Sequence, residues 1–405
     1  MKTSLGNPTV IGHTVLGALL AAIRDQQPVA GFTHNFYRYP ARFSPVFARA
    51  AIEAFSQPGE LVLDPFMGGG TTLVEARLLG RRGIGIDVSE LSVFIAKVKS
   101  TPLSKAQLEE VASWVKETQS HLTIRSKVPD SNRPEDSYKR NLVGETWRIR
   151  KVIEIALNQL ATLNTLEERS FARCGILKTA QWALDCRKDI PSVAAFRTRF
   201  KENFDQMREA AQLFSSAVRE VDGSAKSQFR TIALKRSAIG LEREKIVTQA
   251  GPPKLILTSP PYPGVHVLYH RWQIRGRRET PAPFWIANCL DGSGSSYYTM
   301  GDRKQRGLKD YYDGIRESYK SLSRISDKNT VIVQLVAFSE PSWQLPQYLK
   351  AMLEAGFSES MLNGHKGAHD LRLWRDVPNR KWYAQQKGAT PSSREVILIH
   401  KLTRA

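Results

Sequence analysis

The chain of 405 residues carries 59 Lys and Arg against 39 Asp and Glu, a net charge of +20, and 41% of its residues are hydrophobic. Its length allows one large domain with insertions or two to three smaller ones, and its ordinary hydrophobic content excludes a wholly disordered chain. The positive charge favours a polyanionic partner such as nucleic acid, and three cysteines without a CxxC pair exclude a disulfide framework and a cysteine-based zinc site.

The first predicted element is an amphipathic helix over residues 10–23. This segment is too short to span a bilayer, and it lacks the basic start and the cleavage site of a secretion signal. We therefore expect a cytoplasmic protein with no membrane partner.

A strand–helix–strand–helix series follows. Residues 61–63 form a short apolar run that leads through an acid and a glycine cluster into a helical pattern over 71–79. A second run at 83–87 also ends in an acid and precedes a helix over 89–99, for which Ser89 is a suitable N-cap. Strands and helices that alternate at this spacing are typical of βαβ units on a parallel sheet.

Helical patterns dominate the next part of the chain. They cover 107–122, 145–163 and 192–221, with a polar loop that contains two prolines at 125–141. Strand patterns then return at 229–234, 254–258, 330–337 and 395–401. The last two of these are typical of the closing strands of an open α/β sheet.

This order of elements predicts an α/β fold with a large helical insertion. We assign residues 1–102 to the first half of the sheet core and 230–405 to its second half. The insertion, residues 103–229, is a candidate target-recognition or partner region.

A glycine loop between the first strand and its helix is the first candidate ligand site. It reads Asp64-Pro65-Phe66-Met67-Gly68-Gly69-Gly70-Thr71-Thr72. Consecutive glycines let the backbone approach a ligand, and the helix N-terminus adds free N–H groups. Because the run has no Gly-Lys-Ser/Thr and is not GxGxxG, a nucleoside triphosphate is not indicated. Asp87, at the end of the next strand, suits hydrogen bonding to both hydroxyls of an adenosine ribose. A glycine-rich turn without a ligand is the alternative.

A second candidate site follows the predicted strand at 254–258. Its sequence is Thr258-Ser259-Pro260-Pro261-Tyr262. The prolines fix the backbone and remove two N–H donors, so their carbonyls remain as fixed acceptors. Such a carbonyl and the Ser259 hydroxyl can accept hydrogen bonds from the exocyclic amino group of a nucleobase, while Tyr262 offers a stacking face worth about 1–3 kcal/mol. A plain proline turn after a strand is the alternative.

Together these motifs resemble those of the amino-group DNA methyltransferases, S-adenosylmethionine-dependent enzymes of the N4-cytosine and N6-adenine types with a Rossmann-like, seven-stranded fold. The glycine loop matches their cofactor-binding motif I, Asp87 the acid of motif II, and the second site catalytic motif IV. Upstream, His34 and residues 39–45 resemble motif X, which packs against the methionine end of the cofactor. The matched motifs fall within residues 32–100 and 230–340.

The resemblance implies S-adenosylmethionine as the cofactor and specific residues as its contacts. These are Tyr39, Pro40, Phe43, Asp64, Pro65, Phe66, Gly68, Gly70, Thr71, Thr72, Asp87 and Thr258. The implied catalytic residues are Ser259, Pro260, Pro261 and Tyr262. The Ser form of motif IV is more frequent in the N4-cytosine enzymes, and none of the cysteines follows a proline, as the cytosine-C5 route would need.

Two features depart from the family pattern. The residues of motif I resemble those of the class of these enzymes in which motif IV precedes motif I. In this chain motif I precedes motif IV, so the chain looks circularly permuted relative to that class. Motif III normally has an acid after the third strand, and here Lys235-Arg236-Ser237 stands there. That change puts the usual contact to the adenine ring in doubt.

Basic residues beside aromatic ones mark the predicted DNA contacts. They lie in a basic loop over 264–310 and in a basic C-terminal segment over 361–394, where the candidates are His270, Arg271, Arg275, Arg277, Arg278, Arg375, Arg380 and Lys381. Arg reads guanine edges or binds phosphates; a solvated basic loop is the alternative. His266 and His270 have helical spacing but no further metal ligand nearby, so no metal is expected. The charges of the insertion are nearly balanced, which argues against its being the main phosphate surface.

We therefore predict a site-specific DNA methyltransferase that modifies N4 of a flipped cytosine in double-stranded DNA, in a restriction-modification or phage-defence system with a partner protein. The alternatives are an N6-adenine DNA methyltransferase, an RNA amino-group methyltransferase, and a catalytically silent DNA-binding subunit.

Overall fold

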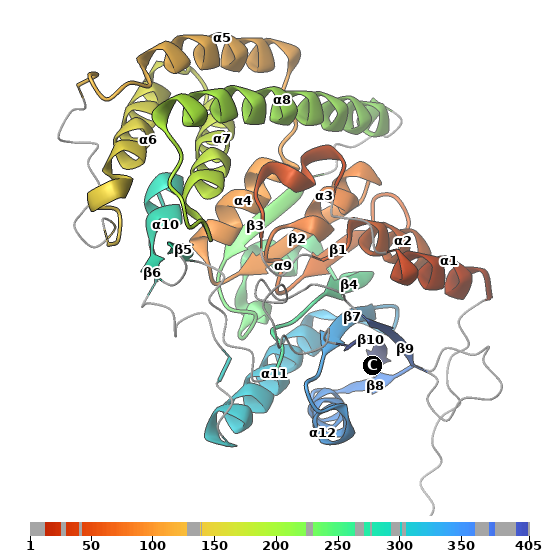
Figure 1. Ribbon diagram of the computed structural model, residues 1–405. Helices are drawn as coiled ribbons and strands as arrows, with labels where there is room; N and C mark the ends of the chain where they lie inside the picture. The colour runs from red at the N-terminus through yellow and green to blue at the C-terminus, as the bar shows by residue number, and fades with distance from the viewer. Residues whose placement is uncertain are drawn as a thin grey trace, which may run out of the picture.

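The computed structural model of the chain (Figure 1) describes most of its residues. The described ranges are 13–25, 30–39, 43–127, 138, 140–223, 230–263, 271–275, 278–292, 300–301, 305–360, 372–376 and 394–403.

A single mostly parallel sheet forms the centre of the molecule. Its strands are β1 (Leu61–Asp64), β2 (Arg82–Asp87), β3 (Thr231–Lys235), β4 (Leu255–Thr258), β7 (Val331–Ala337), β8 (Phe357–Glu359), β9 (Leu373–Asp376) and β10 (Arg394–Leu402). The order is β3-β2-β1-β4-β7-β10-β8, and β9 also pairs with β10. Strands β3 to β7 in this order are parallel, whereas β10 runs antiparallel to β7, β8 and β9. The strand order reverses between β1 and β4, where open α/β sheets bind their ligands.

Helices cover both faces of this sheet. One face carries α1 (His13–Arg24), α2 (Pro45–Phe55), α3 (Thr71–Leu78) and α4 (Glu90–Ser100), and the other carries α9 (Lys245–Ala250), α11 (Gln305–Ile325) and α12 (Pro341–Glu354). Strands β1, β4 and β7 are therefore buried on both faces, which explains their unbroken apolar runs. Ser89 caps α4 as predicted, since its hydroxyl accepts from the backbone N–H of Ser92.

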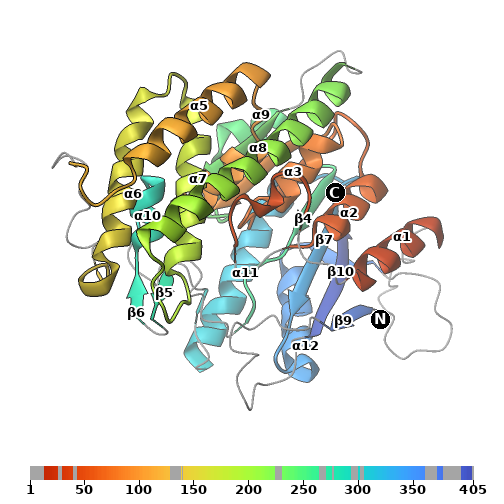
Figure 2. The same cartoon turned by 45° about the horizontal axis from the view of Figure 1, so that its top comes forward.

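The insertion is an assembly of helices beside the first half of the sheet (Figures 1 and 2). It contains α5 (Lys105–His121), α6 (Trp147–Gln159), α7 (Leu166–Leu184) and α8 (Val193–Gly223), with short 3-10 turns η3 (Gly144–Thr146) and η4 (Leu160–Thr162). Aromatic side chains fill its interior: the rings of Phe200 and Phe204 lie 4.7 Å apart, and Trp114 packs on both.

A later segment completes this helical core. The hairpin β5 (Trp272–Ile274) and β6 (Arg278–Thr280), followed by α10 (Ala282–Ala287), packs into the same apolar cluster as α5 to α8. The Trp272 indole also donates a hydrogen bond to the Tyr37 hydroxyl at 3.0 Å. Tyr37 directly follows the 3-10 helix η1 (Phe32–Phe36). We call residues 105–223 and 271–289 together the insertion lobe. The domain boundaries given above remain predictions.

The predicted α/β fold with a large helical insertion is confirmed. The predicted strands appear as β1, β2, β3, β4, β7 and β10. Helix α7 was not predicted, because it contacts α4, α5, α6, α8 and α10 and is buried on most sides, so it has no one-sided apolar pattern. The described helices include none long and apolar enough to cross a membrane.

Candidate active site

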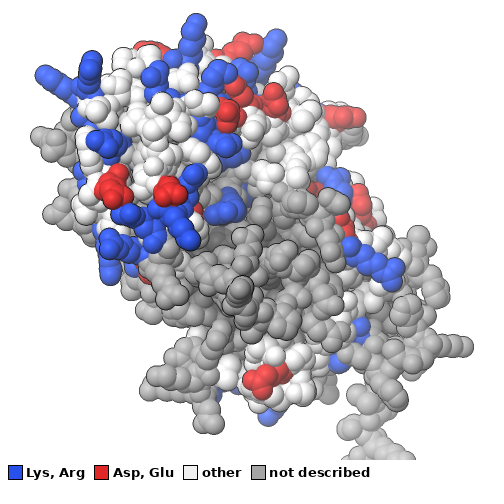
Figure 3. Space-filling model, viewed as in Figure 1, with Lys and Arg blue, Asp and Glu red and all other residues white. Residues whose placement is uncertain are grey.

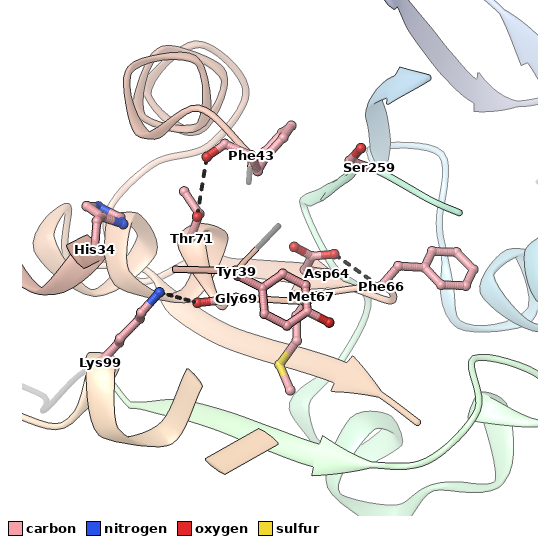
Figure 4. Close-up of a pocket in the computed structure, with 11 residues that line it drawn as sticks. His34, Tyr39, Phe43, Asp64, Phe66, Met67, Gly69, Thr71, Lys99 and Ser259 are labelled. Carbon is pink, nitrogen blue, oxygen red and sulfur yellow. Dashed lines mark hydrogen bonds between the residues drawn. The ribbon is translucent and has the colours of Figure 1, made fainter. Parts of the chain in front are cut away.

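A pocket opens at the carboxyl ends of β1 and β4, where the strand order reverses. Its walls are His34, Tyr39, Phe43, Asp64, Phe66, Met67, Gly68, Gly69, Thr71, Lys99 and Ser259. In Figure 4, His34 and Lys99 lie at one side, Ser259 at the other, and Tyr39 and Asp64 between them. The pocket therefore joins the predicted cofactor loop to the predicted catalytic segment.

Asp64 ties the two motifs together at the end of β1. One carboxylate oxygen accepts from the Thr72 hydroxyl at 2.6 Å, and the other accepts from the Thr258 hydroxyl at 2.7 Å and the Phe66 amide at 3.1 Å. Burial raises the pKa of Asp64 to about 6, against the effect of these donors. Thr72 and Thr258 thus contact the acid of the loop, which holds the glycine loop in register with the end of β4.

The three glycines have different surroundings. Gly68 and Gly70 have φ of 47° and 77°, in the region that favours glycine. A Cβ on Gly68 would lie 3.2 Å from the Tyr39 ring, and one on Gly70 would lie 2.7 Å from the Ala96 side chain. Gly68 and Gly69 keep the loop open under Tyr39, whereas Gly70 lets α3 approach α4.

Asp87 lies at the end of β2 and is half-buried. Its carboxylate accepts from the Gly68 amide at 3.0 Å and the Ser89 amide at 2.8 Å. Burial raises its pKa to about 6. Asp87 is not among the residues that line the pocket, and it supports the glycine loop from the side of β2.

One end of the pocket is built from buried ionisable groups. The His34 ring nitrogen Nε2 lies 2.7 Å from a Glu75 carboxylate oxygen, and Arg49 binds the other oxygen at 2.9 Å. Lys99, 2% exposed, donates from Nζ to the Gly69 carbonyl at 3.1 Å. His34 Nδ1 is buried with no hydrogen-bond partner, and burial lowers the pKa of this histidine. Polar groups of this kind are costly to bury, which points to a polar ligand here.

The predicted catalytic segment, Ser259–Tyr262, is held by residues from β7, β10 and α11. The Ser259 hydroxyl donates to the Leu335 carbonyl at 3.0 Å and lies 3.2 Å from the Tyr262 hydroxyl. The Tyr262 hydroxyl donates to Glu395 at 2.7 Å, and the Tyr311 hydroxyl donates to the Pro261 carbonyl at 2.9 Å. Pro260 is buried beside them. All four predicted catalytic residues are thus held near the pocket.

The remaining predicted cofactor contacts are placed as follows. Phe43 lies at the pocket wall, where its carbonyl is 3.4 Å from the Thr71 hydroxyl. Tyr39 donates or accepts a hydrogen bond with Ser92 at 2.9 Å. Pro65 lies between Asp64 and Phe66 and does not line the pocket. Pro40 is outside the described residues.

The residues in the place of motif III are engaged in ion pairs. The Lys235 amine binds the Glu90 carboxylate, and Arg236 binds Glu244 at 2.8 Å. The other oxygen of Glu90 accepts from the Leu290 amide at 2.6 Å. A carboxylate therefore does lie at the end of β3, supplied by the start of α4 rather than by β3 itself.

The predicted DNA contacts fall into three groups. Arg271 forms an ion pair with Asp291 at 2.6 Å, Arg275 pairs with Glu145 at 2.9 Å while remaining 45% exposed, and Arg278 is exposed on β6. The backbone of Arg375 lies in β9 opposite Glu395. His270, Arg277, Arg380 and Lys381 lie outside the described residues, as does His266.

In the described part of the chain, no cluster of His, Cys, Asp and Glu is placed to bind a metal.

Several residues of the site were not predicted. In the sequence analysis, Glu395 was only the first residue of a predicted strand. Lys99 was the last residue of a predicted helix, and Glu75 lay within another. Tyr311 lies in α11, which was not predicted. Their partners are distant in sequence, so no local spacing could have revealed them. For Glu395, Lys99 and Glu75, a charged residue within a predicted strand or helix was the available signal.

Comparison with known proteins agrees with the motifs. Residues 22–98 match a family model described as DNA methylase, which covers both N6 and N4 enzymes. The chain is 29% identical over 148 residues to the type II methyltransferase M.MvaI of Kocuria varians and 39% identical over 85 residues to the type II methyltransferase M.BsoBI of Geobacillus stearothermophilus.

These matches cover only parts of the proteins. They include 32% and 21% of this chain, and 33% and 16% of the two relatives. Among solved structures, an rRNA methyltransferase from Streptomyces viridochromogenes aligns over 95% of this chain and 90% of its own, at 11% identity and a TM-score of 0.35. That score is too low to carry an argument. The sequence matches confirm the resemblance to the amino-group DNA methyltransferases and S-adenosylmethionine as the cofactor.

Proposed function

We propose that this protein transfers a methyl group from S-adenosylmethionine to the exocyclic N4 amino group of a cytosine flipped out of double-stranded DNA. The observation that carries this proposal is that Ser259 and the glycine loop line one pocket, with Asp64 joining their two strands. A site that only bound DNA would not need this junction between a cofactor loop and an amino-group acceptor.

The pocket suits the methionine end of the cofactor, and Asp87 beside the glycine loop suits its ribose. The buried amine of Lys99 and the unpartnered Nδ1 of His34 suit the methionine carboxylate, and the Asp64 carboxylate suits the methionine ammonium. Asp87, beside the glycine loop, is the proposed partner of the ribose hydroxyls. When bound, the cofactor supplies a methyl group on a positively charged sulfur.

The catalytic segment would act mainly by positioning. The Ser259 hydroxyl and the Pro260 carbonyl would accept the two hydrogens of the target amino group and so aim its lone pair at the methyl group. The Tyr262 ring, held through its hydroxyl, would stack on the flipped base. The Tyr311 hydroxyl donates a hydrogen bond to the Pro261 carbonyl, which holds the second proline in place.

The DNA-contacting surface that we propose lies on the insertion lobe. Arg140, Arg148, Arg275 and Arg278 are exposed, and we call them the basic patch. The Arg275–Glu145 ion pair and a 2.7 Å hydrogen bond from Asn141 to the Glu279 carbonyl bring the hairpin against the start of α6. Figure 3 shows Lys and Arg side chains gathered over this part of the lobe. Exposed Arg beside a helix N-terminus suits DNA phosphates.

The Ser form of motif IV supports cytosine over adenine as the target base. We further propose that the enzyme belongs to a restriction-modification or phage-defence system, as the type II relatives suggest.

Nucleoside mass spectrometry tests the reaction and the base together. The protein is incubated with S-adenosylmethionine and unmethylated genomic DNA, which is then digested to nucleosides. We expect N4-methylcytosine from the wild type and none from Ser259→Ala or Tyr262→Ala. N6-methyladenine would overturn the choice of base while keeping the reaction class. Neither product from a protein that binds the cofactor in calorimetry would overturn the DNA methyltransferase proposal, and parallel incubation with RNA identifies an RNA enzyme.

A further inference from the structure

Glu395 is a fully buried carboxyl group at the start of the last strand, next to the catalytic segment. It lies opposite Ala337 in the β7–β10 pairing, so its backbone is fixed by the sheet. Strand β7 also supplies the Leu335 carbonyl that holds Ser259. A buried carboxyl is costly unless its hydrogen-bonding capacity is used, which directs attention to what Glu395 contacts.

Glu395 is the end of a chain of hydroxyl groups that begins in the pocket. Ser259 Oγ, at the pocket wall, lies 3.2 Å from Tyr262 Oη, and Tyr262 Oη lies 2.7 Å from Glu395 Oε1. Tyr262 donates its hydrogen to Glu395, so its oxygen can accept one from Ser259 when the Ser259 hydroxyl turns from the Leu335 carbonyl, to which it donates at 3.0 Å, toward Tyr262. In that arrangement the remaining lone pairs of Ser259 can accept a hydrogen from a substrate amino group.

We propose that Glu395 receives, through Tyr262 and Ser259, the proton that the target amino group loses on methylation. This inference rests on the proposed function, and it concerns a residue outside the motifs that led to it. In methyl transfer, the nitrogen lone pair forms the new N–C bond while the S–C bond breaks and leaves its electron pair on sulfur. The nitrogen then carries a positive charge and must lose one of its two hydrogens.

Three short transfers remove that proton. The nitrogen releases it to Ser259 Oγ, Ser259 passes its own hydrogen to Tyr262 Oη, and Tyr262 passes its hydrogen to Glu395. The carboxylate ends neutral, the two hydroxyls end as they began, and the methylated amino group is neutral. A hydroxyl cannot keep the extra proton, and here Glu395 is the base that receives it through Tyr262 and Ser259.

The test compares Glu395→Gln, Tyr262→Phe and the double variant with the wild type. Gln keeps an oxygen that accepts from Tyr262, and Phe keeps the stacking ring, so each change removes proton transfer while preserving shape. Single-turnover methyl transfer to unmethylated genomic DNA is measured across pH, alongside cofactor affinity by calorimetry and the melting temperature. Glu168→Gln is the matched control, because Glu168 is a buried glutamate that caps α7 far from this chain of hydroxyls.

We expect each single variant to lose about 100-fold in transfer rate at unchanged cofactor affinity. The double variant should lose no more than either single one, because the two residues serve one path. At saturating S-adenosylmethionine, where ionisation of Asp64 and Asp87 no longer limits cofactor binding, the wild-type rate should rise with pH to a plateau, and Glu395→Gln should lose that rise. A Glu395→Gln rate within threefold of the wild type, or losses that multiply in the double variant, would overturn the inference alone. Absence of transfer by the wild type would overturn the proposed function and this inference with it.

Discussion

The sheet core and the insertion lobe bury different chemistry. Around the pocket, the sheet core encloses Asp64, Glu75, Lys99 and Glu395, each of which is 3% exposed or less. The insertion lobe encloses mainly apolar and aromatic side chains, and its buried Glu168 serves a capping box. Buried charge costs free energy, so its concentration at the pocket indicates selection for binding and chemistry, whereas the lobe shows the ordinary requirements of a stable core.

Alanine substitutions at two glycines, Gly70 in the sheet core and Gly175 in the insertion lobe, should differ most in their effect on stability. A Cβ on Gly70 would meet the Ala96 side chain at 2.7 Å and the Ala96 Cα at 2.8 Å, and Gly70 also has positive φ. We expect Gly70→Ala to lower the free energy of unfolding by about 2–5 kcal/mol, which sums left-handed strain and overpacking. Urea unfolding measures this loss. A compensating change from Ala96 to Gly should restore little of it, because the helix backbone remains in the way; full recovery would contradict the backbone argument.

Gly175 in the insertion lobe should behave differently. A Cβ there would overlap the tip of the Phe204 ring, so the obstacle is a side chain. We expect Gly175→Ala to cost about 1–3 kcal/mol. Adding Phe204→Leu to this variant should recover most of the loss in the same unfolding experiment, although Phe204→Leu alone destabilises. If the double variant were less stable than both single ones, the proposed clash would be wrong.

Lys99 tests whether the buried charge of the sheet core serves the cofactor. Replacing it with Met removes the amine that faces the pocket, and we expect about tenfold weaker binding of S-adenosylmethionine, or about 1.4 kcal/mol. Isothermal calorimetry measures the affinity. Lys97→Met, an exposed position on the same helix, is the control and should bind normally. Equal affinities for both variants would remove Lys99 from the proposed carboxylate site.

Cofactor affinity should also depend on pH through Asp87. Burial raises its pKa to about 6, and only its ionised form accepts from both ribose hydroxyls. Affinity should therefore be constant above pH 7 and fall by up to about tenfold for each unit below 6. The effect on stability has the opposite sign: the folded carboxyl binds more protons than an ordinary one between pH 3.8 and about 6, so this group stabilises less as the pH rises through that window. Asp87→Asn should make the affinity profile shallower and leave the part that comes from Asp64, whose pKa burial also raises to about 6. A profile unchanged by the substitution would exclude Asp87 as a cause.

The smallest effect is expected at the basic patch of the insertion lobe. Arg148→Gln with Arg278→Gln should weaken DNA binding several-fold and reduce the slope of log affinity against log salt by about 2, since each Arg would contact one phosphate. Fluorescence anisotropy over a salt series measures both quantities. Lys105→Gln, exposed at the start of α5, is the control for general charge loss. An unchanged slope would move the phosphate surface away from the patch.

The same comparison explains what could be predicted from the sequence. Strands such as β1 and β4 are buried on both faces and read as unbroken apolar runs, and the glycine loop and Ser-Pro-Pro-Tyr are contiguous in sequence. The sheet and the motif residues were therefore predictable. Glu395 contacts Tyr262 across 133 positions. The hairpin and α10 join an apolar cluster whose preceding member along the chain is Ala211. Contacts between residues so far apart in sequence produce no periodic pattern of apolar residues. The packing of the insertion lobe and the contacts of Glu395 could therefore be found only from the structure.

The position of β10 has a consequence for synthesis of the protein. This strand lies between β7 and β8, and it carries Glu395, yet it is separated from β7 by α12, β8 and β9 along the chain. A ribosome delivers the chain from its start, so the glycine loop and the insertion lobe emerge long before the strand that completes the sheet. The nascent polypeptide can form the glycine loop early, but Tyr262 lacks its partner Glu395 until residues 394–402 have left the exit tunnel. Assembly of the complete pocket region during synthesis therefore waits for β10, even after the glycine loop has folded.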